Sequence, residues 1–201
     1  MLIVGIAGGI ASGKSMVSTV FKEQGAFVLD ADQVGHQVLT RSEVRNQIRK
    51  LWGDLVFRDD DSVNREKLGA IVFDPLNGAL ELSRLERITH PLIRECLEDQ
   101  VRKLISEEEF SIAVLDAPVM FKAGWDGFCD RLIFVDSSLE TRQSRAMVRG
   151  WTISEFETRE AAQVSLDVKR SRSDWLIQND GTPAELKERA LAIWDEFISL
   201  D

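Results

Sequence analysis

The feature that most constrains this chain is a glycine-rich segment near its N-terminus. Residues 8 to 15 read Gly-Gly-Ile-Ala-Ser-Gly-Lys-Ser and match the pattern G-x-x-x-x-G-K-[ST] in full. The segment follows an apolar run and precedes a stretch with helical spacing, which is the strand–loop–helix context that this pattern requires. Gly8 and Gly13 permit backbone angles that side chains would forbid, so the N–H groups between them can turn inward around a phosphate. Lys14 would add a positive charge at the β- and γ-phosphates, and the Ser15 hydroxyl would bind Mg²⁺. The sequence therefore predicts a nucleotide-binding site.

Short apolar runs predict a parallel sheet. They are continuously apolar rather than alternating, as expected for strands covered by helices on both faces. The five predicted strands are Leu2 to Ile6, Ala26 to Asp30, Ile112 to Asp116, Leu132 to Asp136 and Trp175 to Gln178. Segments with helical spacing separate them, so we expect an α/β fold of the P-loop NTPase type with a five-stranded parallel sheet.

Two long segments interrupt this alternation. The segment from about residue 41 to residue 109 contains no convincing strand, and its pattern is typical of a charged amphipathic helix. The segment from about residue 139 to residue 171 has the pattern of a helix rich in arginine. We expect a single domain whose core comprises residues 1–40, 110–138 and 172–201. Ligands of open α/β sheets lie beyond the carboxyl ends of the strands. Both inserted segments leave from that end or return to it, so either could cover the ligand.

Charge and composition exclude several classes of protein. The formal net charge of −9 over 201 residues argues against a general nucleic-acid binder, which needs a basic surface. The N-terminus has no basic signal region, and no segment is long and apolar enough to span a membrane. Cys96 and Cys129 have no metal or redox spacing, which suits a reducing compartment. We therefore expect a cytoplasmic protein, monomeric or weakly associating.

Carboxylates follow the predicted strands at the edge where a nucleotide would lie. Asp30 ends the second predicted strand and Asp32 begins the next helix. A kinase needs a carboxylate there to orient and deprotonate an acceptor hydroxyl, although Asp32 could also be a simple helix N-cap. Asp116 ends the third predicted strand, where it could hold the Mg²⁺ shell. The residues alone leave both alternatives open.

The sequence resembles the dephospho-CoA kinase family over nearly its whole length. The resemblance rests on the glycine-rich loop and on further motifs in the same order and spacing as in that family. These motifs are Asp30-Ala31-Asp32-Gln33-Val34-Gly35-His36, Asn64-Arg65-Glu66-Lys67-Leu68, Ile71-Val72-Phe73, Ile88-Thr89-His90-Pro91, Ala117-Pro118-Val119-Met120-Phe121, and the separate residues Gln143, Arg145, Arg149, Arg159, Gln163, Lys169, Asp174, Ile177, Asn179 and Gly181.

The resemblance implies a kinase core, a helical CoA domain and an arginine-bearing lid. The implied reaction transfers the γ-phosphate of ATP, with Mg²⁺, to the ribose 3′-hydroxyl of dephospho-CoA. The family's catalytic aspartate falls on Asp32, and Lys14 and Arg149 complete the implied catalytic set. Arg149, together with Arg145, would reach the ATP phosphates from the lid. The implied ATP loop comprises Ala11, Ser12, Gly13, Lys14, Ser15 and Met16.

Other interpretations remain open at this point. Another small-molecule kinase, acting on a nucleoside or nucleotide, would share every chemical element of this site. A nucleotide-dependent switch protein is a further alternative, although the Asn-Lys-x-Asp element of guanine-specific switches is not found after the fourth predicted strand. Lys122 stands where the family usually has glutamate, a charge reversal that a degenerate kinase could also show. Charge runs usually form a solvated helix face, which is the alternative for the arginines at 142, 145, 149, 159, 170 and 172.

Overall fold

The computed structural model describes residues 1–74 and 76–199. The chain divides into two compact units, which are treated separately below. The sheet unit comprises Met1–Asp30 and Lys103–Asp201, and the helical unit comprises Ala31–Arg102.

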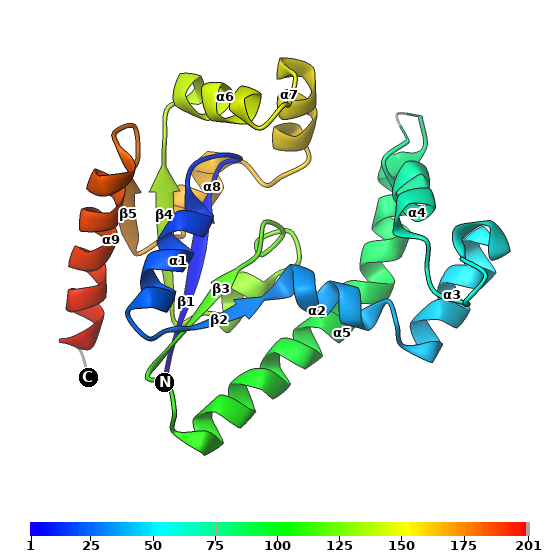
Figure 1. The fold of residues 1–201 in the computed structure, drawn as a ribbon, viewed down its shortest axis with the longest axis horizontal. Coiled ribbons are helices and arrows are strands. Elements are labelled where there is room, and N and C mark those ends of the chain that lie inside the picture. The colour runs from blue at the N-terminus through cyan, green and yellow to red at the C-terminus, as the bar shows by residue number, and fades with distance from the viewer. Residues whose placement is uncertain (75, 200–201) are drawn as a thin grey trace. The chain divides into compact units, whose positions relative to one another are not determined.

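The sheet unit is built on five parallel strands in the order β2-β3-β1-β4-β5 (Figure 1). All five predicted strands are confirmed, with ends that differ by at most two residues. Their bounds are β1 Leu2–Gly8, β2 Phe27–Asp30, β3 Ile112–Asp116, β4 Arg131–Asp136 and β5 Trp175–Gln178. Most of their residues are buried apolar side chains, because helices cover the sheet.

The strand register brings carboxylates to the edge where the glycine-rich loop leaves the sheet. Asp116 of β3 is paired with Asp30 of β2 on one side and with Ile6 of β1 on the other. Ile6 lies two residues before the end of β1, so the two aspartates lie at the same edge as the start of the loop.

Helices α1 (Lys14–Glu23) and α9 (Pro183–Ile198) pack side by side on the sheet (Figure 1). Phe21 of α1 meets Trp194 of α9 edge to face, with ring centroids 5.4 Å apart. Thr182 and Glu185 form a capping box that starts α9. The core beneath these helices contains Val4, Ile6, Val17, Val20, Val114, Ile133, Val135, Ile177, Leu186, Ala190 and Phe197.

Helices α6 (Leu139–Val148) and α7 (Ile153–Ala161) lie beyond the carboxyl ends of the strands, and Figure 1 shows them above the glycine-rich loop. The short helix α8 (Leu166–Ser171) packs beside β1. Thr152 and Glu155 form a capping box at the start of α7. A 3₁₀ turn at Trp125–Phe128 precedes β4.

The described part of the segment 41–109, most of which lies in the helical unit, contains no strand, as the sequence predicts. Only an isolated bridge joins Phe57 and Val63. The helices of the helical unit are α2 (Ala31–Val38), α3 (Ser42–Trp52), α4 (Arg65–Val72) and α5 (Gly78–Glu107), with a 3₁₀ turn at Asp54–Val56, and α5 continues into the sheet unit. Buried aliphatic side chains of the unit include Val44, Ile48, Val56, Leu68 and Val72. Across 1–74 and 76–199, none of the helices combines the length and apolarity that a membrane crossing needs.

Candidate active site

The loop between β1 and α1 has the backbone that the glycine pattern predicts. Gly8 has a φ of 150° and Gly13, the residue that caps α1, has a φ of 103°. A Cβ on Gly8 would lie 2.6 Å from the carbonyl oxygen of Val135, and one on Gly13 would overlap the side-chain amide of Asn179. Both positions therefore require glycine for conformation and for space.

Side chains that follow two other strands hold this loop in place. Ser12 is fully buried, and its carbonyl oxygen accepts hydrogen bonds from Asn179 Nδ2 at 2.6 Å and from the Ser137 hydroxyl at 3.2 Å. Ser137 follows β4 and Asn179 follows β5. Ser137 was not singled out from the sequence, and Asn179 entered only through the family resemblance. The signal that could have found them is a polar residue directly after the carboxyl end of a buried strand.

Two lysines contribute positive charge at the loop. Lys14 Nζ donates to the Gly9 carbonyl oxygen at 2.7 Å, and Lys169 Nζ of α8 donates to the Gly8 carbonyl oxygen at 3.3 Å. Burial, followed by the nearby charge of Lys169, lowers the pKa of Lys14 from 10.5 to about 8, although Asp116 and Glu160 act against this shift. Burial also lowers the pKa of Lys169, which is 3% exposed. Both cations are poorly solvated and would gain strongly from an anionic partner.

The lowered pKa of Lys14 predicts that ATP binding depends on pH. A bound phosphate stabilises the charged form, so above about pH 8 ATP binding should require uptake of a proton. We expect the Kd for ATP to rise as the pH increases from 7.5 to 9, by up to about tenfold for each pH unit above the pKa. Isothermal titration calorimetry in buffers of different ionisation enthalpy measures the proton uptake.

The control for this prediction is Lys14→Arg, whose guanidinium stays charged over this range. Its dependence on pH should be clearly weaker than that of the wild type. A wild-type Kd that is constant from pH 7.5 to 9 would contradict a Lys14 that titrates near 8.

A small hollow adjoins the loop and receives both predicted lid arginines. Arg145 donates to the Ser137 hydroxyl and to Asn179 Oδ1, each at 3.3 Å. Arg149 is the exposed C-cap residue of α6, and within the described chain its side chain makes no hydrogen bond or ion pair. The hollow has a volume of about 180 Å³. Its lining residues are Ala11, Gly13, Met16, Arg145, Arg149, Asn179, Pro183 and Leu186.

The hollow combines an apolar wall with two cations. Met16, Pro183 and Leu186 supply the apolar part, and Leu186 is almost fully buried. An aromatic base fits such a wall, while its phosphates would lie against the arginines and the loop amides. Neither Pro183 nor Leu186 was predicted as a site residue, because the start of α9 is far from the loop in sequence.

The residues at this edge suit Mg²⁺. Ser15 presents an exposed hydroxyl in the first turn of α1, and the carboxylate of Asp116 is close enough to Lys14 to raise the pKa of that lysine. Mg²⁺ prefers oxygen ligands and is usually held by one or two side chains together with substrate phosphates. No cluster of three or more His, Cys, Asp or Glu side chains able to hold a metal occurs in the described residues.

The arginines of the lid segment do not form one solvated face. Arg142 is only 4% exposed, and its guanidinium donates to Glu160 at 2.5 Å. The interpretation of a solvated face is therefore wrong for Arg142. Arg159 lies over the ring of Trp151 at 4.4 Å, and Arg170 pairs with Asp136 at 2.7 Å. Lys122, the departure from the family pattern, is exposed in the turns that follow β3.

In the helical unit, Asp32 lies in the first turn of α2 and is exposed. The helix begins at Ala31, so Asp32 lies inside the helix and is not its N-cap. His36 follows Asp32 by four residues and so shares its face of α2. The imidazole of His36 contacts the guanidinium of Arg65, and Asn64 caps α4 by accepting from the Lys67 amide at 3.1 Å.

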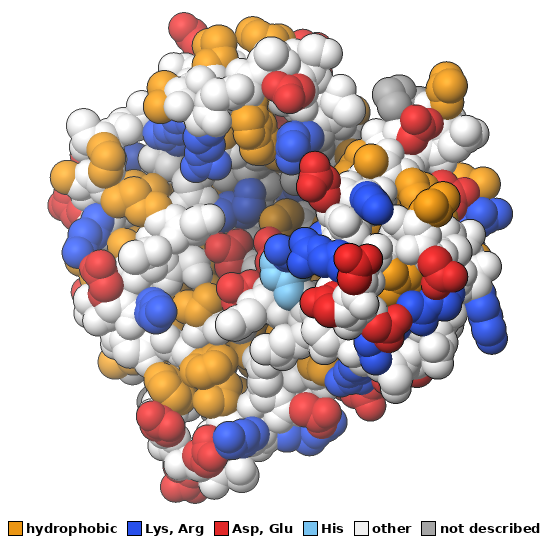
Figure 2. All heavy atoms as spheres, turned by 45° about the vertical axis from the view of Figure 1, so that its right-hand side comes forward, with side chains coloured by type: hydrophobic (Ala, Val, Ile, Leu, Met, Phe, Trp, Pro, Cys, Tyr) orange, Lys and Arg blue, Asp and Glu red, His pale blue; other side chains and the backbone are white. Residues whose placement is uncertain are grey.

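His36 and Arg65 belong to the lining of a hollow of about 220 Å³. Arg45 and Arg58 also line it, so one histidine and three arginines meet within this unit. Figure 2 shows a histidine side chain with basic side chains beside it. The carboxylate of Asp60 also lines the hollow, but the three arginines are suited to a phosphorylated ligand.

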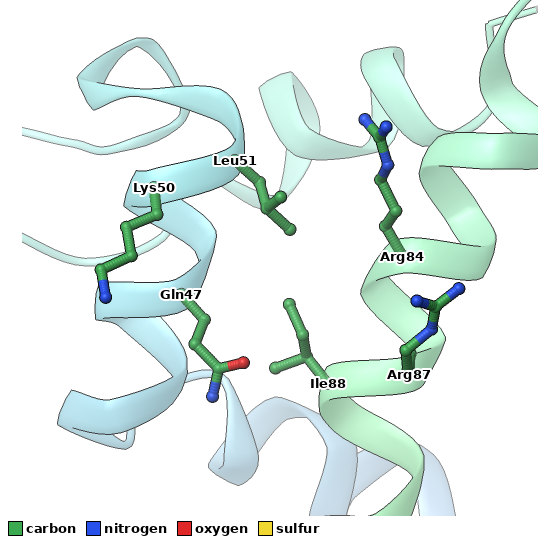
Figure 3. Close-up of a pocket in the computed structure, with 6 residues that line it drawn as sticks. All are labelled: Gln47, Lys50, Leu51, Arg84, Arg87 and Ile88. Carbon is green, nitrogen blue, oxygen red and sulfur yellow. The ribbon is translucent and has the colours of Figure 1, made fainter.

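A second hollow of the helical unit, of about 560 Å³, lies between α3 and α5 (Figure 3). Leu51 and Ile88 point toward one another across it, whereas Lys50 points away. Arg84 is paired with Glu81 at 2.9 Å. The six described lining residues, Gln47, Lys50, Leu51, Arg84, Arg87 and Ile88, include no carboxylate, so this hollow offers contacts to a ligand but no general base.

A glycine-rich loop at the end of the first parallel strand, with two lysines at its carbonyls and arginines from the helices above it, defines a P-loop phosphotransferase. Comparison with known proteins then identifies the family. The family model described as dephospho-CoA kinase matches residues 2–185, and the chain belongs to this family.

Individual relatives agree with that assignment. The dephospho-CoA kinase of Symbiobacterium thermophilum is 39% identical over 197 residues, covering 96% of this chain and 80% of the relative. That of Geobacter sulfurreducens is 37% identical over 196 residues, covering 96% and 98%. The crystal structure of TT1252 from Thermus thermophilus superposes with a TM-score of 0.79 at 32% identity, covering 97% of each chain. Dephospho-CoA kinase from Campylobacter jejuni has the same fold, with a TM-score of 0.72 at 22% identity, covering 97% and 96%.

Proposed function

We propose that this protein transfers the γ-phosphate of ATP to the 3′-hydroxyl of the ribose of dephospho-CoA, giving coenzyme A and ADP. The observation that carries the proposal is the P-loop, with the poorly solvated Lys14 at its centre, in a chain that belongs to the dephospho-CoA kinase family. Phosphoryl transfer depends chiefly on positioning and charge stabilisation, and Lys14, Lys169 and Arg149 supply the positive charge.

We further propose a role for each residue of the nucleotide site. The loop from Ala11 to Met16 binds the phosphates through its amides, and the wall of Met16, Pro183 and Leu186 receives the base. Ser15 would hold Mg²⁺, and the ion would supply positive charge that neutralises the phosphates. Arg149, with Arg145, stabilises the transferred phosphoryl group as the lid segment, from about residue 139 to residue 171, closes over it.

Asp32 is the general base of the proposed reaction. Its carboxylate takes the proton of the 3′-hydroxyl as the ribose oxygen bonds to the γ-phosphorus and the bond to the ADP oxygen breaks. The proposal is supported by the exposed position of Asp32, two residues after the carboxyl end of β2. His36 of α2, together with Arg45, Arg58 and Arg65 of the same hollow, would bind the pyrophosphate of the acceptor. The cytoplasmic location of the protein and its monomeric or weakly associating state remain predictions.

The decisive experiment compares acceptors. With Mg·ATP, dephospho-CoA should be phosphorylated at the 3′-hydroxyl far faster than adenosine or AMP. The truncated acceptors should lose kcat as well as affinity, because contacts to the remote part of the acceptor help to orient its hydroxyl. Mass spectrometry of the product should show one added phosphate, and a 3′-deoxy analogue should be inert.

Two outcomes would overturn the proposed substrate. Turnover of adenosine or a nucleoside monophosphate at the rate of dephospho-CoA would favour a more general small-molecule kinase. Release of inorganic phosphate at the same rate with and without any acceptor would favour a nucleotide-dependent switch.

A further inference from the structure

Asn179 contacts both the P-loop and an arginine of α6 through the two ends of one side-chain amide. Its Nδ2 donates a hydrogen bond to the Ser12 carbonyl oxygen at 2.6 Å, and its Oδ1 accepts one from Arg145 Nη2 at 3.3 Å. A backbone carbonyl can only accept and a guanidinium can only donate, so these partners fix the orientation of the amide. The side chain thereby joins a residue of the ATP loop to a residue of the lid segment.

Burial and close packing restrict which side chain can stand at position 179. Asn179 is 3% exposed. A Cβ on Gly13 would lie 2.2 Å from its Nδ2, so the amide lies directly against the backbone of the loop. Aspartate has the same shape but offers no N–H to the Ser12 carbonyl, and alanine offers neither a donor nor an acceptor. The position therefore requires a short side chain that carries both.

The backbone of Asn179 is itself held in place. Its N–H donates to the Asp136 carbonyl oxygen at 2.7 Å, and its carbonyl oxygen accepts from the Ser137 hydroxyl at 2.7 Å. A hydroxyl has a single hydrogen, and the contact of the same hydroxyl with the Ser12 carbonyl is longer, at 3.2 Å. Ser137 therefore chiefly supports Asn179, and the direct link between the loop and Arg145 passes through the Asn179 side chain.

We propose that Asn179 is a positioning residue of the kinase, which holds Arg145 beside the P-loop so that the guanidinium and the loop amides bind the same nucleotide. This inference rests on the proposed function, in which Arg145 and the loop both contact ATP. Arg145 and Asn179 line the same hollow beside the loop. A guanidinium has more N–H groups than the contacts to Ser137 and Asn179 use, so others remain for the phosphates. An arginine held in this way before ATP arrives loses less conformational freedom on binding.

The test is a double-mutant cycle on the affinity for the β,γ-imido analogue of ATP with Mg²⁺, measured by isothermal titration calorimetry. Asn179→Ala removes both ends of the link, and Arg145→Met keeps the apolar stem of the arginine but removes its donors. We expect Asn179→Ala to raise the Kd about tenfold in the wild-type background. In the Arg145→Met background it should raise the Kd by only about threefold or less, because the group that Asn179 positions is then absent.

The matched control is Gln178→Ala, which removes the neighbouring exposed amide. The hydrogen bond of that amide goes to the Asp136 carboxylate and not to the loop. This variant should leave the Kd within about twofold of its parent in both backgrounds. If Arg145→Met binds the analogue too weakly to be measured, Arg145→Lys takes its place, since lysine keeps the charge but not the fork of donors.

A lower melting temperature of Asn179→Ala is expected in any case, because the Ser12 carbonyl loses a buried donor. If this variant does not fold, Asn179→Asp carries the cycle. Its carboxylate has no cation beside it once Arg145 is replaced by methionine. The loss of affinity caused by Asn179→Asp should therefore be larger in the Arg145→Met background than in the wild-type background.

The outcomes separate this inference from the proposed function. An effect of Asn179→Ala that is as large in Arg145→Met as in the wild-type background would show that Asn179 only shapes the loop. A Kd that is unchanged or lower in Asn179→Ala would show that the link does not assist binding. Either result overturns the inference, as does an equal effect of Asn179→Asp in both backgrounds. A wild-type protein that does not bind the analogue at all would overturn the proposed function itself.

Discussion

Replacing Lys14 with alanine is expected to lower the turnover of dephospho-CoA by about 10²- to 10³-fold or more, while the protein remains folded. Lys14 is the charge nearest the centre of the P-loop, and loss of one preorganised group that stabilises transition-state charge has effects of this size. The fold should persist because the pKa of Lys14 is lowered by burial, which means that the cation is poorly solvated and contributes little to stability. Steady-state kinetics and a thermal melt measure the two effects.

The matched control is Lys22→Ala, an exposed lysine in the last turn of the same helix. It removes the same charge from α1 but should leave turnover within about twofold of the wild type, as surface substitutions away from a site usually have small effects. Activity of Lys14→Ala within a few-fold of the wild type would contradict the assignment of the P-loop as the ATP site.

Replacing Asp32 with asparagine should lower kcat by about 10²-fold or more, with little change in the affinity for ATP. Asparagine keeps the shape of the side chain but cannot take the proton of the acceptor hydroxyl. Asp32 is exposed, so the substitution buries no unpaired group, and loss of its interaction with the N-terminal end of α2 should cost under about 1 kcal/mol. Single-turnover kinetics with saturating ATP would isolate the chemical step.

Two further variants make this test specific. Asp30→Asn changes the neighbouring carboxylate at the end of β2, and a larger loss of kcat there than at position 32 would move the role of base to Asp30. Asp99→Asn removes an exposed carboxylate of α5, which is paired with Arg102, and should leave kcat unchanged. Loss of ATP binding in Asp32→Asn, with transfer retained, would make Asp32 a nucleotide or metal ligand.

Most of the sheet and the P-loop could be predicted because their signals are local. The strands are short, continuously apolar runs, and the runs at 112–116 and 175–178 match β3 and β5 residue for residue. Gly8 and Gly13 are needed for backbone angles that lie within the loop itself. Gly25, with a φ of 104°, lies just beyond the end of α1, where glycine is a local signal for the end of a helix.

The surroundings of the loop could not be predicted, because they depend on which distant segments pack against it. Periodicity shows which face of a helix is apolar, but not what covers that face. Leu186 is one of the core residues of α9, and the structure also places it in the wall of the hollow beside the P-loop. Asn179 was named only because it matches the family pattern. The sequence did not predict its hydrogen bond to Ser12, which lies 167 residues away along the chain.

By itself, the sequence determined the order of strands and helices, the phosphate-binding backbone and the family to which the chain belongs. Only the tertiary structure determined which charged side chains are buried. Arg142 reads in sequence as one of many solvated arginines, since charged side chains are rarely buried. It is buried here because Glu160, eighteen residues away, neutralises it, and because the Ser137 carbonyl oxygen accepts a hydrogen bond from its Nε. A charge can leave water only when its partners are brought to it in space, and that is a property of the folded chain.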